Sequence, residues 1–455
     1  MKTSPRTISL LAVTTLLLTA SAAPEKGYVA HEWGTFTSVQ GADGKQLDWN
    51  PLTVSELPGF VYHLGNAGGG ERASTLRFLT AKTGFVMRQR METPVIYFYA
   101  DRPQTVDVDI RFPQGVVTEW FPQARPLPRL AQGGEPVRDR IAWDRVEILP
   151  RETSVPLPSD ASGSHYFAAR GAEANPVAVK SAAGVPEVEK FLFYRGVGNF
   201  TAPLTVTTGD EARELQVKND GKEALGRLFV LQIRDGEGAF QELSGLDPGA
   251  ARVVRLGTEG TRRPLADLRR QLRARVADAL VADGLFAAEA EAMVATWDDS
   301  WFTETGLRVL YTLPTAWVDR VLPLKLTPAP TQVARVFVGR AEVLTPAVEF
   351  ALLRQLLRFH DGEAGDRTAA ITAAKALQLG RFAEPAVRHI LAGLPANRAF
   401  SNHAWELLEA VAKPEPAKSA AQPAPGHAGV PGPELPSLQP TAPLTFACGA
   451  VQSQP

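Results

Sequence analysis

Cysteine is almost missing from this chain, whose 455 residues include only Cys448, close to the C-terminal end. One cysteine cannot form an internal disulfide, so the stability of the fold has to come from core packing. Cys448 is expected to be a bystander in the tail, and an intermolecular bridge is the alternative.

An excess of charge of one sign is lacking too. The chain has 48 lysine and arginine residues against 49 aspartate and glutamate residues. Because no basic surplus is present to hold a phosphate backbone, nucleic acid is not an expected partner. Beyond the N-terminal leader no run of about 18 apolar residues occurs, so we expect no transmembrane segment in the mature chain.

Complete catalytic motifs are also absent. His31-Glu32 begins like the H-E-x-x-H motif of zinc proteases, but Thr35 stands where the second histidine is needed. No G-x-S-x-G serine elbow occurs. The glycine-rich stretch 65–72 lacks the Lys-Ser or Lys-Thr pair of a phosphate loop. The sequence therefore disfavours a zinc protease, a serine hydrolase of that kind and a P-loop enzyme.

The residues around His31 have the composition of a strand. Aromatic, valine and threonine residues fill 29–39, and an Asp-Gly turn signal follows at 43–44. Side chains alternate in direction along a strand. We therefore expect His31 and Trp33 on one face and Glu32 on the other, which prevents His31 and Glu32 from binding one metal ion together.

The N-terminus reads as a secretory leader. Lys2 and Arg6 precede an apolar run over 8–18, and residues 20–22 form an A-x-A cleavage site. We predict that residues 1–22 are a cleaved signal peptide and that the protein is secreted or periplasmic. No cysteine follows the run, so a bacterial lipid anchor is not expected.

The next part of the chain is rich in strand signals. Alternating or continuous apolar runs separated by turn residues occur at 94–100, 105–113, 116–122, 141–149 and 190–197. They predict a β-rich domain over 28–200. Further strand signals at 201–258 predict a small immunoglobulin-like β unit, or else the far edge of the first domain.

The hydrophobic period then changes to that of helices. A stripe at three- and four-residue spacing predicts a helix over 264–284, and Trp297 and Trp301 are expected to pack within a second one. We predict a mixed helix and strand segment over 262–345, a helical module over 346–412 and a Pro/Ala-rich disordered tail over 413–455. The predicted fold class is multidomain α+β, with antiparallel sandwich or barrel-like sheets in the N-terminal two-thirds.

Several strings together resemble a known family. They are "HEWGTFTS", "RMETPVIYFYA", "TEWFP", "FLFYRGVG" and "SWFTETGLRVLYTLP". The chain from about residue 28 to 411 is similar to a family of secreted bacterial proteins of unknown function. The resemblance implies secretion and a bacterial source, and it carries over no catalytic residue.

Four residues are weak candidates for a site. His31 and His63 are candidate metal ligands in the β region, although no two histidines have a tight metal-binding spacing. Glu92 and Glu119 stand beside apolar groups, which raise the pKa of a carboxyl and suit it to general acid work. The plainer interpretation of these two glutamates is an ion pair with a nearby arginine such as Arg88, Arg90 or Arg111.

Two functions stay open at this point. The first, which we favour, is a non-catalytic binding or envelope-associated β protein whose partner is a glycan or an envelope protein. The second is a secreted hydrolase, acting on polysaccharide, with His31, His63, Glu92 and Glu119 in its site. No cofactor is indicated by the sequence, and neither the ligand nor the oligomeric state follows from it.

Overall fold

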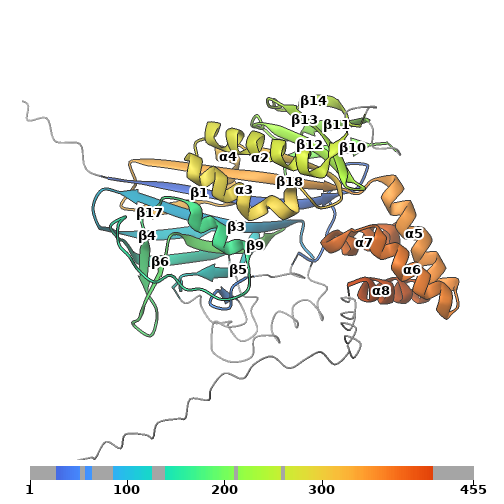
Figure 1. Ribbon diagram of the computed structural model, residues 1–455, viewed down its shortest axis with the longest axis horizontal. Coiled ribbons are helices and arrows are strands. Elements are labelled where there is room, and N and C mark those ends of the chain that lie inside the picture. The colour runs from blue at the N-terminus through green and yellow to red at the C-terminus, as the bar shows by residue number, and fades with distance from the viewer. Residues whose placement is uncertain are drawn as a thin grey trace, which may run out of the picture. The chain divides into compact units, whose positions relative to one another are not determined.

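The computed structural model describes residues 27–51, 57–63, 86–125, 139–209, 214–257 and 262–412. The leader, the glycine-rich stretch 65–72 and the tail with Cys448 lie outside these ranges. The α+β prediction is confirmed: sheets dominate the first two-thirds of the chain and helices follow them (Figure 1).

A ten-stranded sheet organises the fold. Its order is β15-β13-β12-β16-β18-β1-β3-β9-β5-β2. The bounds are β15 Arg263–Pro264, β13 Glu237–Leu243, β12 Leu228–Arg234, β16 Gly306–Leu313, β18 Gln332–Val343, β1 Tyr28–Gln40, β3 Gln89–Ala100, β9 Leu192–Gly198, β5 Gly115–Phe121 and β2 Tyr62–His63. β1 lies in the middle, parallel to β18 and antiparallel to β3. The strand predicted around His31 is therefore a central strand, which explains its apolar character on both faces.

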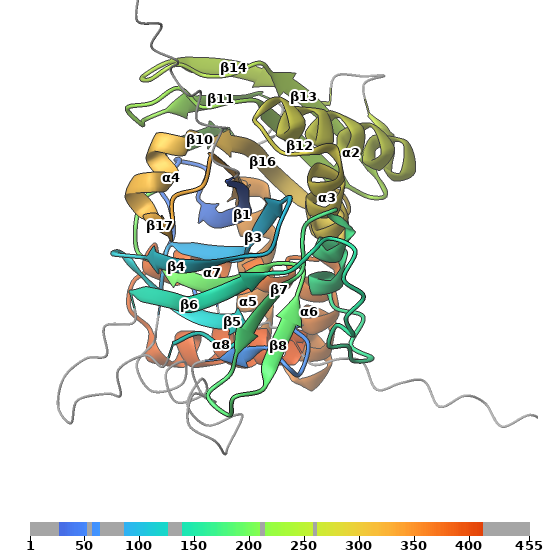
Figure 2. The same cartoon turned by 90° about the vertical axis from the view of Figure 1, so that its left-hand side faces the viewer.

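Two smaller sheets accompany it (Figure 2). One has the order β17-β4-β6-β7-β8, with bounds Leu324–Thr327, Gln104–Arg111, Arg140–Ile148, Val177–Lys180 and Pro186–Glu189. The other has the order β10-β11-β14, with bounds Leu204–Thr208, Glu214–Asn219 and Ala251–Arg255. The 201–258 segment is thus divided, because β12 and β13 continue the main sheet. It does not form a separate immunoglobulin-like sandwich.

The two faces of the main sheet bury separate cores. On one face the smaller sheets enclose side chains such as Phe36, Trp143 and Val230. On the other face lie the helices α2 (Leu265–Ala282) and α3 (Ala287–Trp301) and the 3-10 helix η1 (His165–Gly171), packed on residues such as Trp33. The short helix α4 (Thr315–Val321) belongs to the first face.

The predicted helical packing is confirmed in this second core. The stripe of α2 is buried at Leu268, Leu272, Val276 and Leu280. Trp297 and Trp301 of α3 are stacked with their rings 6.1 Å apart, and both are buried.

The helical module follows Thr345, whose hydroxyl caps the first helix. It comprises α5 Pro346–Asp361, α6 Ala364–Ala376, η2 Gly380–Phe382, α7 Ala383–Ala392 and α8 Arg398–Ala412. Its core includes Val39, Trp49 and Leu344, so the module packs against the end of β1 and β18. Within the described ranges, no helix has the length and apolarity needed to cross a membrane.

Candidate functional site

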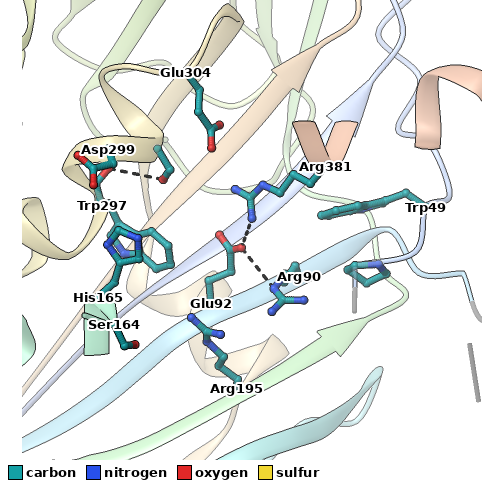
Figure 3. Close-up of a pocket in the computed structure, with 12 residues that line it drawn as sticks. Trp49, Arg90, Glu92, Ser164, His165, Arg195, Trp297, Asp299, Glu304 and Arg381 are labelled. Atoms are coloured by element: carbon teal, nitrogen blue, oxygen red, sulfur yellow. Dashed lines mark hydrogen bonds and ion pairs between the residues drawn. The ribbon is translucent and has the colours of Figure 1, made fainter. Parts of the chain in front are cut away.

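A cavity of about 280 Å³ lies where β3 and β9 meet the end of α3, the start of η1 and the segment η2 (Figure 3). Six separate stretches of the sequence supply its described walls. The lining residues are Trp49, Pro51, Arg90, Glu92, Ser164, His165, Arg195, Trp297, Asp299, Ser300, Glu304 and Arg381.

The strands beside this cavity are irregular. The pairing of β3 with β9 shifts register between Met91 and Val95, and Thr93 has a φ of 48° in that stretch. β5 has a second shift, which ends at Glu119. Bulges of this kind bend a strand and redirect its side chains, and they are common beside functional sites. Glu92 lies at the start of the first irregular stretch, and Thr37 of β1 donates to it.

Glu92 is held by three donors. Its Oε1 pairs with Arg90 Nε at 3.3 Å and accepts a short hydrogen bond from Arg381 Nη1. Its Oε2 accepts from Thr37 Oγ1 at 2.7 Å. Burial alone would raise the pKa of Glu92, but the charges of Arg381 and Arg90 outweigh it and lower the pKa to about 2. Glu92 is therefore ionised at neutral pH and cannot act as a general acid.

The arginines are less well compensated than the glutamate. Burial, followed by the repulsion of Arg90, lowers the pKa of Arg195 to about 10. Burial likewise lowers the pKa of Arg90. Arg195 donates from Nη2 to Thr93 Oγ1 at 3.3 Å. Both arginines stay charged at neutral pH, so they present cationic groups to the cavity.

The unsatisfied atoms of this cavity are all of one chemical kind. Among its described lining residues, four buried side-chain atoms lack a hydrogen-bond partner: Arg195 Nε, Trp297 Nε1, Arg381 Nε and Arg381 Nη2. All four are nitrogen donors. A buried donor without an acceptor costs about 1–3 kcal/mol, so the cavity is suited to a ligand that supplies acceptor oxygens.

Arg381 reaches this cavity from the helical module. It lies in η2 just after two residues of positive φ, Gln378 at 53° and Gly380 at 52°. Its neighbour Phe382 packs on Trp49 with ring centroids 6.2 Å apart. A non-glycine residue at positive φ stores backbone strain, and such strain is concentrated at functional sites.

Carboxylates line the opposite side of the cavity. Asp299 follows Trp297 near the end of α3, and its side chain is 72% exposed. Glu304, whose side chain is 38% exposed, forms an ion pair with the buried Arg340. Burial acts to raise the pKa of Glu304, but the charges of Arg340 and Arg381 act more strongly to lower it, so the net shift is downward. The Glu304 carboxyl is therefore ionised at neutral pH.

His31 lies apart from this cavity. Its Nδ1 is 2.8 Å from Glu289 Oε2 of α3, and Tyr99 donates to Glu289 Oε1 at 2.7 Å. Trp33 belongs to the same core, whereas Glu32 points to the other face and bonds Arg335 at 2.6 Å. The predicted alternation along β1 is confirmed. Within the described part of the chain, no three His, Cys, Asp or Glu side chains gather as a metal site requires.

His63 and Glu119 are brought together, but not in the cavity. They are directly opposite each other where β2 pairs with β5. Glu119 accepts a short hydrogen bond from Thr118, and its charge favours the charged forms of Arg90 and Arg195. Of the four sequence candidates, only Glu92 lines the cavity. The ion pair anticipated for Glu92 exists with Arg90, while its second partner, Arg381, was not anticipated.

Some site residues had a signal in the sequence. Arg195 interrupts the apolar strand "FLFYRGVG", and a charge inside a buried strand marks a position with a special role. Arg381 and Asp299 had none, because each occupies an ordinary polar position on or beside a helix.

Comparisons with known proteins add little to this description. No protein-family model matches the chain, and no curated protein does. Among solved structures, the mu-homology domain of yeast delta-COP-I, with a bound peptide, aligns at a TM-score of 0.27 and 8% identity, covering 71% of this chain and all of that one. The same domain alone aligns at a TM-score of 0.26 and 7% identity. At such TM-scores the likeness supports no conclusion about fold or function.

Proposed function

We propose that this protein is a non-catalytic binding protein that holds an anionic ligand in the cavity between β3, α3 and η2. The observation that carries the proposal is the set of four buried, unpartnered nitrogen donors at the cavity wall. Because every one is a donor, a ligand rich in acceptors satisfies them all, whereas an apolar or cationic ligand satisfies none.

The charges favour the same kind of ligand. Arg195 and Arg90 repel each other in a partly water-excluded place, and an anion between them would relieve that repulsion. The free Nε and Nη2 of Arg381 form one edge of its guanidinium, which is the fork that binds carboxylate, sulfate or phosphate with two parallel hydrogen bonds. We therefore propose an oxyanion group as the feature that is recognised.

The hydrolase hypothesis finds less support. A glycosidase needs one carboxyl with a raised pKa, and the pKa of Glu92 is lowered to about 2. His31 is bonded to Glu289, in a cluster that does not line the cavity. A binding role requires neither a general acid nor a nucleophile.

The cellular setting is part of the same proposal. The leader over 1–22 and the resemblance to a family of secreted bacterial proteins support action outside the cytoplasm. An acidic group on a glycan or on another envelope component is a ligand of the proposed chemistry in that setting.

Titration calorimetry of the purified protein with acetate, sulfate, phosphate and glucuronate tests the proposal. We expect at least one of them to bind with a dissociation constant in the millimolar range or below. Arg195→Gln should weaken that binding at least tenfold. Arg88→Gln is the matched control, because it makes the same change of residue type at an arginine that does not line the cavity. Arg88 lies two residues before Arg90 and pairs with Asp48. Absence of binding to the wild type, or equal binding by Arg195→Gln, would refute the proposal.

A further inference from the structure

The charges around the cavity are balanced in number and separated in space. Among the lining residues that the structure describes, three are arginines and three are carboxylates, so the formal charges of these six cancel. Figure 3 shows Arg90 and Arg195 beside Glu92 on one side, while Asp299 and Glu304 lie on the far side of it, near the end of α3. Described walls whose charges cancel and have opposite signs at the two ends favour a dipolar occupant over a simple ion.

The two ends differ in what they offer a ligand. At the arginine end Glu92 already occupies Arg90 and one nitrogen of Arg381, which leaves Arg195 and the other edge of Arg381 for an external anion. At the other end Asp299 is mostly exposed, and a guanidinium nitrogen of Arg269 lies 3.5 Å from it. Its carboxylate therefore keeps acceptor capacity for a cationic donor.

We propose that the ligand is an organic acid that also carries an ammonium group, such as an amino acid, an amino-sugar acid or a short peptide. Its anionic end lies at Arg195 and Arg381, and its ammonium group lies at Asp299 and Glu304. This inference rests on the anion-binding function proposed above and specifies its ligand class.

Size and donor inventory agree with such a ligand. A volume of about 280 Å³ is at the lower end of the range for small-molecule sites, so the cavity suits a molecule of a few linked groups. The unpartnered Trp297 Nε1, on a side chain only 5% exposed, provides an independent donor at the cavity wall. A dianion of similar length would place its second negative group against Asp299 and Glu304, where like charges repel.

A series of straight-chain acids tests this directly. Each ω-amino acid from β-alanine to 5-aminopentanoate is compared by calorimetry with the unbranched monocarboxylate and the dicarboxylate of the same chain length. We expect at least one amino acid to bind ten times more tightly than its monocarboxylate, and the dicarboxylate to bind no better than the monocarboxylate.

The variant Asp299→Asn identifies the recognising group. It should bring the ratio of amino acid to monocarboxylate affinity close to one. Asp267→Asn is the control, because Asp267 is an exposed acid of α2 that pairs with Arg270 away from the cavity, and it should keep the ratio.

The outcomes separate the two proposals. If monocarboxylates bind through Arg195 but amino acids bind no more tightly, or if Asp299→Asn keeps the wild-type ratio, the dipolar inference is overturned and anion binding stands. If no member of the series binds and the oxyanions of the first experiment do not bind either, both proposals fail together.

Discussion

Replacing Arg195 with methionine should stabilise the ligand-free protein. The pKa of Arg195 falls from its usual value to about 10 in the fold, because burial and the charge of Arg90 disfavour the guanidinium cation. At neutral pH Arg195 is charged in both the folded and the unfolded chain, so the folded state bears the free-energy cost of keeping the buried guanidinium charged. At about 1.4 kcal/mol per pH unit this cost is roughly 3 kcal/mol.

The gain from the substitution is smaller than that cost. Arg195 is partly exposed, so solvent screens part of the unfavourable charge. The substitution also removes the hydrogen bond to Thr93 and the approach of the guanidinium to the Phe193 ring at 5.9 Å, which together are worth about 1–2 kcal/mol. We expect a net increase of about 1 kcal/mol in the free energy of unfolding, measured by urea denaturation in a buffer free of phosphate, sulfate and carboxylates.

Arg335→Met is the matched control, because Arg335 is a buried arginine whose partners are complete. It bonds Glu32 at 2.6 Å, Asp319 at 2.6 Å and the Leu322 carbonyl at 2.7 Å. Its removal leaves Glu32 buried without its counter-ion, and breaking such a pair costs about 3–5 kcal/mol. If Arg195→Met destabilises the protein by 1 kcal/mol or more, Arg195 is a structural ion-pair residue and the reasoning about the cavity is refuted.

Three further predictions concern other parts of the molecule. Glu92→Gln should lower the free energy of unfolding by about 3–5 kcal/mol at pH 7, since it removes the counter-charge of two arginines. The low pKa of Glu92 stabilises the fold at pH values above about 4.5, and this stabilisation is lost as pH falls toward 2. Urea denaturation should therefore show the stabilities of the variant and the wild type converging at acid pH, and a constant difference would contradict this. His31→Ala should cost roughly 1–3 kcal/mol, because Glu289 loses a buried partner, and a stoichiometric metal found by elemental analysis in the wild type and lost in the variant would overturn this structural role. N-terminal sequencing of the exported protein should find Ala23 or Pro24 first, and intact Met1 in the cytoplasm would exclude a cleaved leader.

The parts of the fold that the sequence predicted are those set by local patterns. Alternation placed His31 and Trp33 on one face of β1 because the side-chain period of a strand is two. The stripe of α2 was equally plain, because a helix that packs on a sheet repeats its apolar residues every three or four positions. The division of 201–258 between two sheets was not predictable in this way. Strand signals show that a segment is extended, but they do not show which edge it joins.

The candidate site depends on contacts between distant parts of the chain. Arg90 is two residues from Glu92, and its role as a partner could be anticipated. Arg381 is 289 residues away and reaches Glu92 only because the helical module packs on the end of β1. No periodicity in the sequence encodes such a contact. The unpartnered donors are still less visible, because a lack of partners exists only once the surroundings are folded.

Local strain and unmet hydrogen bonding coincide at this cavity, and that coincidence is itself informative. Thr93 beside Glu92, and Gln378 three residues before Arg381, adopt a positive φ that costs a non-glycine residue of order 1–3 kcal/mol. The same two places present charged side chains to the cavity, and Nε and Nη2 of Arg381 still lack acceptors there. A sequence under selection for stability alone would favour glycine at the strained positions and apolar or fully paired groups at the charged ones. Their retention together is what a binding site requires, because the ligand supplies the acceptors that complete the arrangement.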